Sequence, residues 1–232
     1  MEDSFAKEEL FDLSDQYEAM LNRGIRLSGE DQYYFIAGRI GDLNKQLPDG
    51  WKPRRILDFG CGIGHAAPFL AEAFPDSDIV GVDTAEQALE HATKTHGSAR
   101  ISFRHIHDLD ESEAFDLCYV NGVFHHIEPL KRPEVLRVIH RSLRPGGYFS
   151  LFENNPWNPG TRMVMARIPF DRDAITLSPY ETERIVRTAG FRLDRTRSLF
   201  YFPRPLAWLR FVEPSLARLP LGAQYYVLAF KP

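Results

Sequence analysis

Apolar residues in the first fifty positions recur at three- and four-residue steps, which is the spacing of one face of a helix. One such stripe covers residues 5–21 and a second covers residues 33–43, with a glycine-containing break between them. The turn residues Pro48, Asp49 and Gly50 end the second stripe. This pattern predicts two helices, which form an N-terminal helical cap over residues 1–50.

From residue 51 the pattern changes to short apolar runs separated by helical stretches. The runs have the length and composition of β-strands and cover residues 56–59, 79–82, 101–103, 115–120 and 148–152. The helical stretches between them cover residues 65–74, 84–95 and 132–142. Strands that alternate with helices predict an α/β fold, in which a parallel sheet carries helices on both faces.

The C-terminal third is less regular. Residues 154–160 have the composition of a loop. A helix is predicted over residues 179–189, because Ser178 is an N-cap residue, Pro179 suits the first helical position and Gly190 follows the end. Two further strands are predicted over residues 191–202 and 223–230.

An insertion rich in Leu and Arg, residues 203–222, separates these last two strands and is interrupted by prolines. We expect it to form a lid over a ligand or a homodimer surface rather than a membrane contact. No internal repeat or low-complexity linker is visible, so residues 51–232 are predicted to form a single globular unit.

Composition excludes several classes of protein. The 232 residues are 44% hydrophobic and 26% charged, as in an ordinary globular protein, and 28 Lys+Arg against 32 Asp+Glu give no overall attraction to nucleic acid. Two cysteines cannot build a disulfide scaffold or, by themselves, a zinc site. Without an apolar run of spanning length or a basic, apolar leader, we expect a cytoplasmic protein with no transmembrane segment.

The near-neutral total hides a division along the chain. Residues 1–130 carry a net charge of −13 and residues 131–232 a net charge of +9. Nearly all the basic residues of the second part are arginines. The division favours either an anionic acceptor on the C-terminal side or an ordinary solvated basic face.

The most informative stretch is Asp58-Phe59-Gly60-Cys61-Gly62-Ile63-Gly64, which follows the first strand and precedes a helix. Glycines let a backbone turn sharply and approach a ligand closely, and the following helix points free N–H groups at polar ligand atoms. A dinucleotide site would need Gly or Ala at position 65, where the chain has His65. The spacing therefore disfavours a nicotinamide-dependent oxidoreductase.

This motif resembles motif I of the class I S-adenosylmethionine-dependent methyltransferases, in their small-molecule branch. The resemblance continues in order along the chain, at Asp83, Asp108-Leu109, residues 115–121 and residues 143–149. It implies a Rossmann-like, doubly wound, mostly parallel seven-stranded sheet with an antiparallel last strand. It also implies S-adenosylmethionine as the cofactor.

The resemblance implies a role for each motif. Asp58 is expected near the methionine end of the cofactor, Asp83 at the ribose and Asp108 at the adenine, although Asp108 could also be a helix or turn cap. Tyr17 and Arg23 of the cap are candidates for the methionine carboxylate or for packing. The full expected cofactor set is Tyr17, Arg23, Asp58, Gly60, Cys61, Gly62, Gly64, Asp83, Thr84, Asp108, Leu109 and Asn121.

Methyl transfer from a sulfonium requires alignment of the acceptor and, for a hydroxyl, removal of a proton. The adjacent His125 and His126, after the fourth strand, resemble the base of small-molecule methyltransferases, and imidazole has a suitable pKa. We expect O-methylation ahead of N- or C-methylation, with His125 favoured as the base. Packing is the alternative role for both histidines.

The acceptor is expected to be a small molecule. Its candidate contacts are Tyr33, Tyr34, Asn154, Asn155 and Trp157. No ligand spacing recurs among the histidines, so no metal is expected. A cofactor-binding scaffold, or an enzyme that uses the cofactor for another reaction, remains the alternative because fold does not fix function. Nucleic-acid methylation is disfavoured, since Asn121-Gly122-Val123-Phe124 stands where an Asn-Pro-Pro-Tyr motif would lie.

Overall fold

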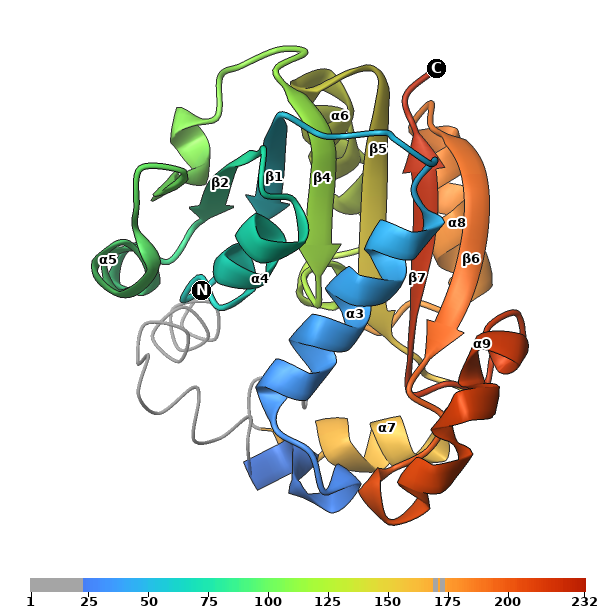
Figure 1. Cartoon of the computed structure of the whole chain (residues 1–232). Helices are drawn as coiled ribbons and strands as arrows, with labels where there is room; N and C mark the ends of the chain where they lie inside the picture. The colour runs from blue at the N-terminus through green and yellow to red at the C-terminus, as the bar shows by residue number, and fades with distance from the viewer. Residues whose placement is uncertain (1–22, 169–170, 172–173) are drawn as a thin grey trace.

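The computed structural model describes residues 23–168, 171 and 174–232 (Figure 1). Seven strands form one sheet in the order β3-β2-β1-β4-β5-β7-β6, in which β7 alone runs antiparallel to its neighbours. This confirms the predicted fold class. The strands are β1 (Arg55–Phe59), β2 (Asp78–Asp83), β3 (Ile101–His105), β4 (Phe115–Asn121), β5 (Leu143–Asn154), β6 (Arg192–Leu199) and β7 (Gln224–Phe230).

Between the strands lie α-helices and several short 3-10 helices. The α-helices are α3 (Gln32–Gln46), α4 (Ala66–Ala73), α5 (Glu86–His96), α6 (Arg132–Ser142), α7 (Pro159–Met165), α8 (Pro179–Thr188) and α9 (Glu213–Leu216). The 3-10 helices are η1 (Arg26–Ser28), η2 (Ile106–Asp108), η3 (Phe124–His126) and η5 (Arg204–Val212). Helix α8 begins with the predicted N-cap, because Ser178 and Glu181 form a reciprocal capping box.

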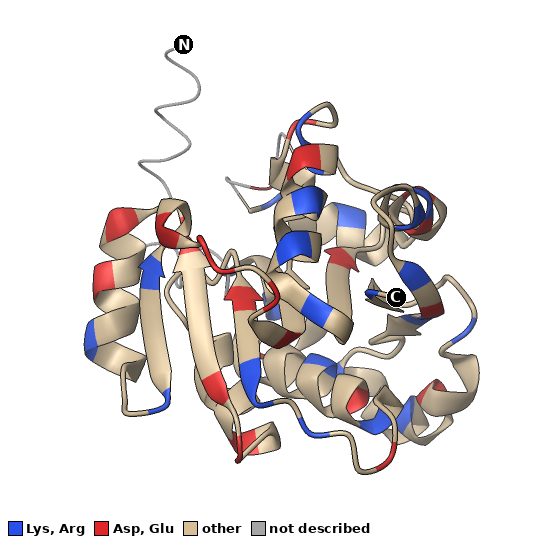
Figure 2. Cartoon of the chain, turned by 90° about the horizontal axis from the view of Figure 1, so that it is seen from above, with Lys and Arg blue, Asp and Glu red and all other residues tan. Residues whose placement is uncertain are grey.

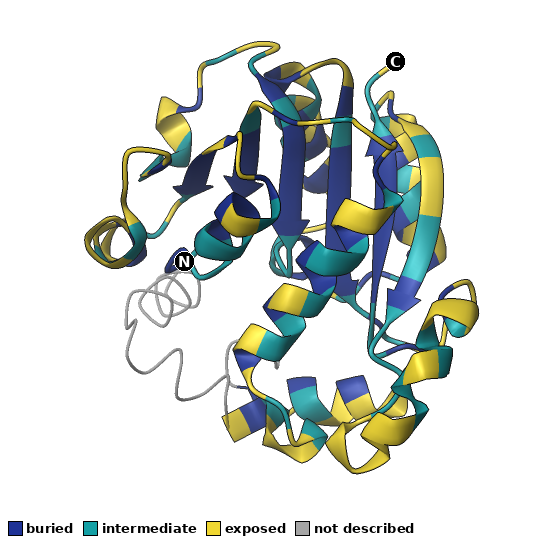
Figure 3. Cartoon of the chain, in the orientation of Figure 1, coloured by how far each residue is buried: buried dark blue, intermediate teal, exposed yellow. Residues whose placement is uncertain are grey.

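The sheet is buried on both faces by helices, as Figure 3 shows for its central strands. Helices α3 and α4 pack on one face, and α6 and α8 pack on the other. Successive residues of a strand point to opposite faces, so Tyr225 packs with α8 and the adjacent Tyr226 packs in the cluster that contains α3. The apolar core therefore fixes the position of α3, the helix that carries residues of the cavity described below.

One predicted loop is partly helical in the structure. The predicted loop over residues 154–160 runs into helix α7, whose N-cap Asn158 accepts a hydrogen bond from the Thr161 N–H at 3.0 Å. Asn followed by Pro is a helix-start signal, which a composition argument alone overlooks. The 203–222 insertion contains η5 and α9.

The parallel strands point their carboxyl ends at a lobe formed by η1, α7 and η5 (Figure 1). Helix α3 runs from this lobe across the sheet. In doubly wound sheets, ligands bind outside the carboxyl ends of the strands.

Candidate functional site

A cavity of about 500 Å³ lies where the carboxyl ends of the strands meet this lobe. Its wall combines the start of α3, the glycine loop after β1, the loop after β4, helix α7, Ile168 and Asp171. The segment after β6 contributes Phe200–Pro203 and Arg210. Segments distant in the sequence therefore share one ligand-sized space.

The glycine loop, residues 60–64, turns sharply at glycines with left-handed backbone angles. Gly60 has a φ of +73° and Gly62 a φ of +52°. A Cβ at Gly60 would lie 2.4 Å from Cγ2 of Val123, so the loop after β4 approaches too closely for any side chain. At Gly62, in contrast, no other described residue lies within 4 Å of that position, and the backbone faces the cavity.

Asp83 supports this loop from the end of β2. Its Oδ2 accepts a hydrogen bond from the Gly62 N–H at 2.7 Å, and its Oδ1 accepts from the N–H groups of Thr84 and Ala85 at 2.8 and 3.1 Å. Thr84 and Asp108 are exposed, whereas Leu109 is buried in the core. All four residues lie outside the wall of the cavity.

Asp58 and Arg39 place two opposite charges at the cavity wall, both nearly inaccessible to solvent. Burial, reinforced by the charge of Asp83 and opposed by Arg39, raises the pKa of Asp58 to about 7. Among the described residues, Oδ2 of Asp58 has no hydrogen-bond partner. Arg39 donates to the Tyr119 hydroxyl at 3.2 Å and to the Gln224 amide oxygen at 2.9 Å.

The thiol of Cys61 lies in the same loop, next to both carboxylates. Burial, together with the negative charges of Asp58 and Asp83, raises its pKa well above the usual range. The thiol donates a weak hydrogen bond to the Gly62 carbonyl at 3.7 Å. Cys61 is therefore a protonated filler of the loop and not a nucleophile.

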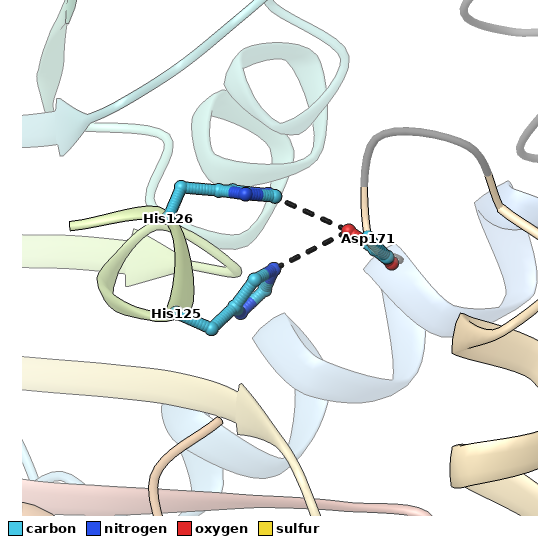
Figure 4. A group of neighbouring side chains, drawn as sticks. All are labelled: His125, His126 and Asp171. Atoms are coloured by element: carbon cyan, nitrogen blue, oxygen red, sulfur yellow. Dashed lines mark ion pairs between the residues drawn. The ribbon is translucent and has the colours of Figure 1, made fainter. Parts of the chain in front are cut away.

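A second polar region of the cavity wall is formed by His125, His126 and Asp171, and Glu153 completes this charged cluster from outside the wall. Nδ1 of His125 lies 2.5 Å from Oε2 of Glu153, and its Nε2 lies 3.4 Å from Oδ1 of Asp171. Nε2 of His126 lies 3.4 Å from the same oxygen of Asp171 (Figure 4). His125, Glu153 and Asp171 are buried, while His126 is partly open to the cavity.

The two carboxylates determine the charge of His125. Burial alone would lower the pKa of this imidazole, but the charges and hydrogen bonds of Glu153 and Asp171 outweigh it and raise the pKa to about 10. His125 is thus an imidazolium at neutral pH. Because an imidazolium has no lone pair to accept a proton, this geometry does not suit the base role favoured from the sequence.

Backbone hydrogen bonds hold the cluster together. The Phe124 N–H donates to Oε1 of Glu153 at 2.8 Å, and the Ile175 N–H donates to the His125 carbonyl at 2.9 Å. Arg132, buried beneath, donates to the carbonyls of Phe124 and Ile175 at 3.1 and 2.6 Å. The loop after β4 and the segment that carries Asp171 are therefore fixed to each other.

The cap candidates fall in different places. Tyr17 lies outside the described residues, and Arg23 is exposed and outside the cavity wall. Tyr34 lines the cavity, and the Arg210 guanidinium lies 4.6 Å from the centre of its ring. Tyr33 points elsewhere, because it stacks on Phe69.

The asparagine and tryptophan candidates also differ in whether they line the cavity. Asn121 and Asn154 line the cavity. Asn155 is fully buried, and its amide group donates to the carbonyls of Pro220 and Gly222, so it anchors the insertion to the sheet. Trp157 is half exposed and lies outside the cavity wall.

The charge division along the sequence becomes a set of ion pairs between the two parts of the chain. Arg197 binds Asp42 through two 2.9 Å hydrogen bonds, and Arg210 pairs with Glu30 at 2.9 Å. Residues of both charges are spread over the molecule (Figure 2). Some of the acidic residues of the first part and the basic residues of the second part therefore neutralise each other within the fold. Within the described ranges, no helix has the length and apolar character that a membrane crossing needs.

Sequence reasoning missed three charged residues of the site, namely Arg39, Glu153 and Asp171. Arg39 is the one arginine of the predicted second helix, but no motif in the sequence distinguishes it from the other arginines of the chain. Glu153 directly precedes the two asparagines selected as candidates, and its position at the end of a predicted strand could have identified it. Asp171 carries no local signal.

Several known proteins resemble this chain in sequence and in fold. A family model described as a methyltransferase domain matches residues 57–149. A trans-aconitate 2-methyltransferase from Variovorax paradoxus is 27% identical over 198 residues, which is 75% of this chain and 74% of that protein. An uncharacterized protein from Rickettsia prowazekii is 32% identical over 134 residues, or 54% of this chain and 52% of the relative.

The fold comparison agrees with the sequence comparison. The crystal structure of an S-adenosylmethionine-dependent methyltransferase from Mesorhizobium loti superposes with a TM-score of 0.60 and 21% identity, over 84% of this chain and all of that one. The chain spans about half the length of the first curated relatives that it matches. The comparisons therefore show a methyltransferase domain over residues 57–149 and, over most of the chain, the fold of an S-adenosylmethionine-dependent methyltransferase.

Proposed function

We propose that this protein transfers the methyl group of S-adenosylmethionine to a hydroxyl oxygen of a small-molecule acceptor. The observation that carries the proposal is a single cavity with two polar regions of different chemistry, the glycine-loop end and the acceptor end. Asp58 and Arg39 face it near the glycine loop, and His126 and Asp171 face it near the loop after β4. The first end suits the cofactor, and the second suits an acceptor that must lose a proton.

The glycine-loop end fits the methionine part of the cofactor, which carries an ammonium and a carboxylate group. The buried Oδ2 of Asp58 offers the ammonium a charged hydrogen-bond acceptor. The guanidinium of Arg39 suits the carboxylate. We assign this role to Arg39 in place of Arg23, because Arg39 lines the cavity.

The adenosine part would extend past Gly62 toward Asp83 and Asp108. A carboxylate has about four acceptor positions. Three backbone N–H groups already bond to Asp83, which leaves it one position for a ribose hydroxyl. Asp83 then has two tasks, because it also holds the glycine loop in its binding conformation.

On the acceptor side, the charged state of His125 leaves His126 and Asp171 as the groups available to the acceptor's hydroxyl. The cofactor supplies a sulfonium-activated methyl group, so the acceptor oxygen bonds to the methyl carbon as the carbon–sulfur bond breaks. The hydroxyl proton must leave by the time the new bond forms. A cluster that is fixed by backbone hydrogen bonds keeps the acceptor oxygen in line for this displacement.

Incubation of the full chain with methyl-labelled cofactor and a metabolite extract tests the proposal. We expect label in a small-molecule product, with one S-adenosylhomocysteine formed for each methyl group transferred. A matched panel of hydroxyl and amine acceptors then tests the preference for oxygen.

If S-adenosylhomocysteine binds tightly but no label is transferred, the alternative of a cofactor-binding scaffold, or of an enzyme that uses the cofactor differently, gains support. If only amines are labelled, methyl transfer stands and the proposed oxygen acceptor is wrong.

A further inference from the structure

We propose that His125, His126 and Asp171 form a binding site for a divalent transition-metal ion, such as Zn²⁺ or Fe²⁺, at the acceptor end of the cavity. The role of the ion in catalysis rests on the proposed function, whereas the site itself rests on geometry. One donor atom from each residue, Nε2 of both histidines and Oδ1 of Asp171, lies within 4.8 Å of the others (Figure 4).

The separations fit the coordination sphere of such an ion. Each histidine Nε2 lies 3.4 Å from Oδ1 of Asp171. In a tetrahedral site with bonds of about 2.1 Å, neighbouring donor atoms are about 3.4 Å apart. Two of the three separations thus already match, and the third, between the two imidazole nitrogens, is no longer than 4.8 Å.

Glu153 gives His125 the orientation that a ligand histidine needs. Its carboxylate oxygen lies 2.5 Å from Nδ1 of His125. With the Nδ1 proton held by that carboxylate, an incoming ion displaces the Nε2 proton to solvent and takes the lone pair of Nε2 on the side of Asp171. Metal-bound histidines almost always have such a carboxylate or carbonyl partner on the second nitrogen.

Charge and ligand type define the class of ion. Glu153 and Asp171 place two carboxylates in a buried position, and a divalent cation held by neutral imidazoles would balance both charges. Two nitrogens and one carboxylate oxygen suit transition metals, whereas Mg²⁺ and Ca²⁺ prefer an all-oxygen shell.

The ligands come from two segments that are already joined. The Ile175 N–H donates to the carbonyl of His125 itself, and Arg132 bridges the carbonyls of Phe124 and Ile175. The loop after β4 is therefore fixed to Ile175 before an ion arrives, and the Ala174 N–H donates to the Asp171 carbonyl at 3.1 Å. Such preorganisation is what a metal site requires of its supporting residues.

Three protein ligands leave coordination positions for the acceptor, because these residues line the cavity. A hydroxyl oxygen bound to the ion would have a lowered pKa, so its proton would pass to solvent water before the oxygen bonds to the methyl carbon. In this arrangement His126 is a ligand, and no histidine base is needed.

Calorimetric titration of the full chain with Zn²⁺, after dialysis against a chelator, tests the site. We expect one ion per chain with micromolar or tighter affinity, and visible absorption typical of tetrahedral coordination when Co²⁺ replaces Zn²⁺. The variants Asp171→Ala and His126→Ala should each weaken binding by about 100-fold or more. Glu153→Gln should weaken it by about 10- to 100-fold.

The control is the double variant His105→Ala, His107→Ala, which removes a second neighbouring histidine pair outside the cavity. It should leave the stoichiometry and affinity unchanged. Equal binding by wild type and Asp171→Ala would overturn the site, as would loss of binding in the control. His126 is partly exposed, so His126→Ala, with its fold checked by circular dichroism, decides the question if Asp171→Ala does not fold.

Failure of this inference and failure of the proposed function give different results. Methyl transfer by wild-type protein that binds no stoichiometric metal would overturn the metal site and leave the proposed function standing. Stoichiometric metal binding that depends on Asp171, without methyl transfer to any acceptor, would support the site and count against the function.

Discussion

At the glycine-loop end of the cavity, most of the chemistry comes from one stretch of chain, residues 58–64. At the acceptor end, His125 and His126, Glu153 and Asp171 come from three segments and meet only in the folded molecule. The first end has a carboxylate that lacks a hydrogen bond on one oxygen, and the second has charges already compensated by neighbours. A ligand can supply the missing hydrogen bond at the glycine-loop end. The cluster at the acceptor end is already held in place and can orient an acceptor.

The largest loss of stability is expected from a substitution in the charged cluster around His125. Glu153→Gln removes the closest counter-charge of a buried imidazolium, so it should lower the free energy of unfolding by about 3–5 kcal/mol. Asp76→Asn, which breaks the exposed ion pair with Lys52, should cost less than about 1 kcal/mol. Urea denaturation of both variants measures the difference. Equal losses would show that the cluster contributes no more than a surface pair.

The next largest effect is expected where the glycine loop contacts the loop after β4. Gly60→Ala adds a Cβ that collides with Val123 of the loop after β4, in a left-handed backbone conformation, and should destabilise the protein by about 3 kcal/mol. Gly62→Ala has the same backbone penalty but open space, so its cost should be about 1 kcal/mol. Thermal unfolding of the two variants separates the collision from the backbone strain.

At the glycine-loop end, a substitution is expected to change the affinity for the cofactor. Asp58→Asn should weaken S-adenosylhomocysteine binding by about 2 kcal/mol, or roughly 30-fold, because a hydrogen bond to a charged group is lost. The exposed Asp78, at the opposite end of β2, provides the control Asp78→Asn, whose affinity should match wild type. Calorimetry measures both. Unchanged affinity in Asp58→Asn would remove Asp58 from the cofactor site.

The same residue should give the ligand-free protein a pH-dependent stability. The pKa of Asp58 is near 3.8 when unfolded and about 7 when folded, so its protonation stabilises the fold below pH 4, and this contribution is lost as pH rises through 7. Asp58→Asn should therefore be more stable than wild type at pH 8, by about 1–2 kcal/mol, and equal to it near pH 4. Unfolding curves at the two pH values check the sign, and a pH-independent difference would contradict it.

The sequence predicted the sheet and the position of the glycine loop after β1, for a physical reason. Alternating apolar strands, helices and glycines at fixed spacing are local patterns, and the strands of Figure 1 follow them. The charged cluster has no such pattern. Asp171 contacts His125 and His126 across more than forty residues of chain, and no spacing along the sequence encodes that contact.

Single residues show the same limit. The resemblance pointed to a cap arginine, yet the fold brings Arg39 and not Arg23 to the cavity, because Arg39 is on the face of α3 that packs on the sheet. Asn155 has the right polarity and sequence position for an acceptor contact. Its side chain, however, is hydrogen-bonded to the insertion and therefore stabilises the fold.

The protonated thiol of Cys61 has a consequence for the chemistry of the glycine loop. S-adenosylmethionine is an alkylating agent, and thiolate sulfur is among the strongest nucleophiles that proteins possess. Asp58 and Asp83, the two carboxylates assigned to the cofactor, are also the charges that raise the pKa of this thiol. The groups that would hold the reagent thus protect the protein from methylating itself.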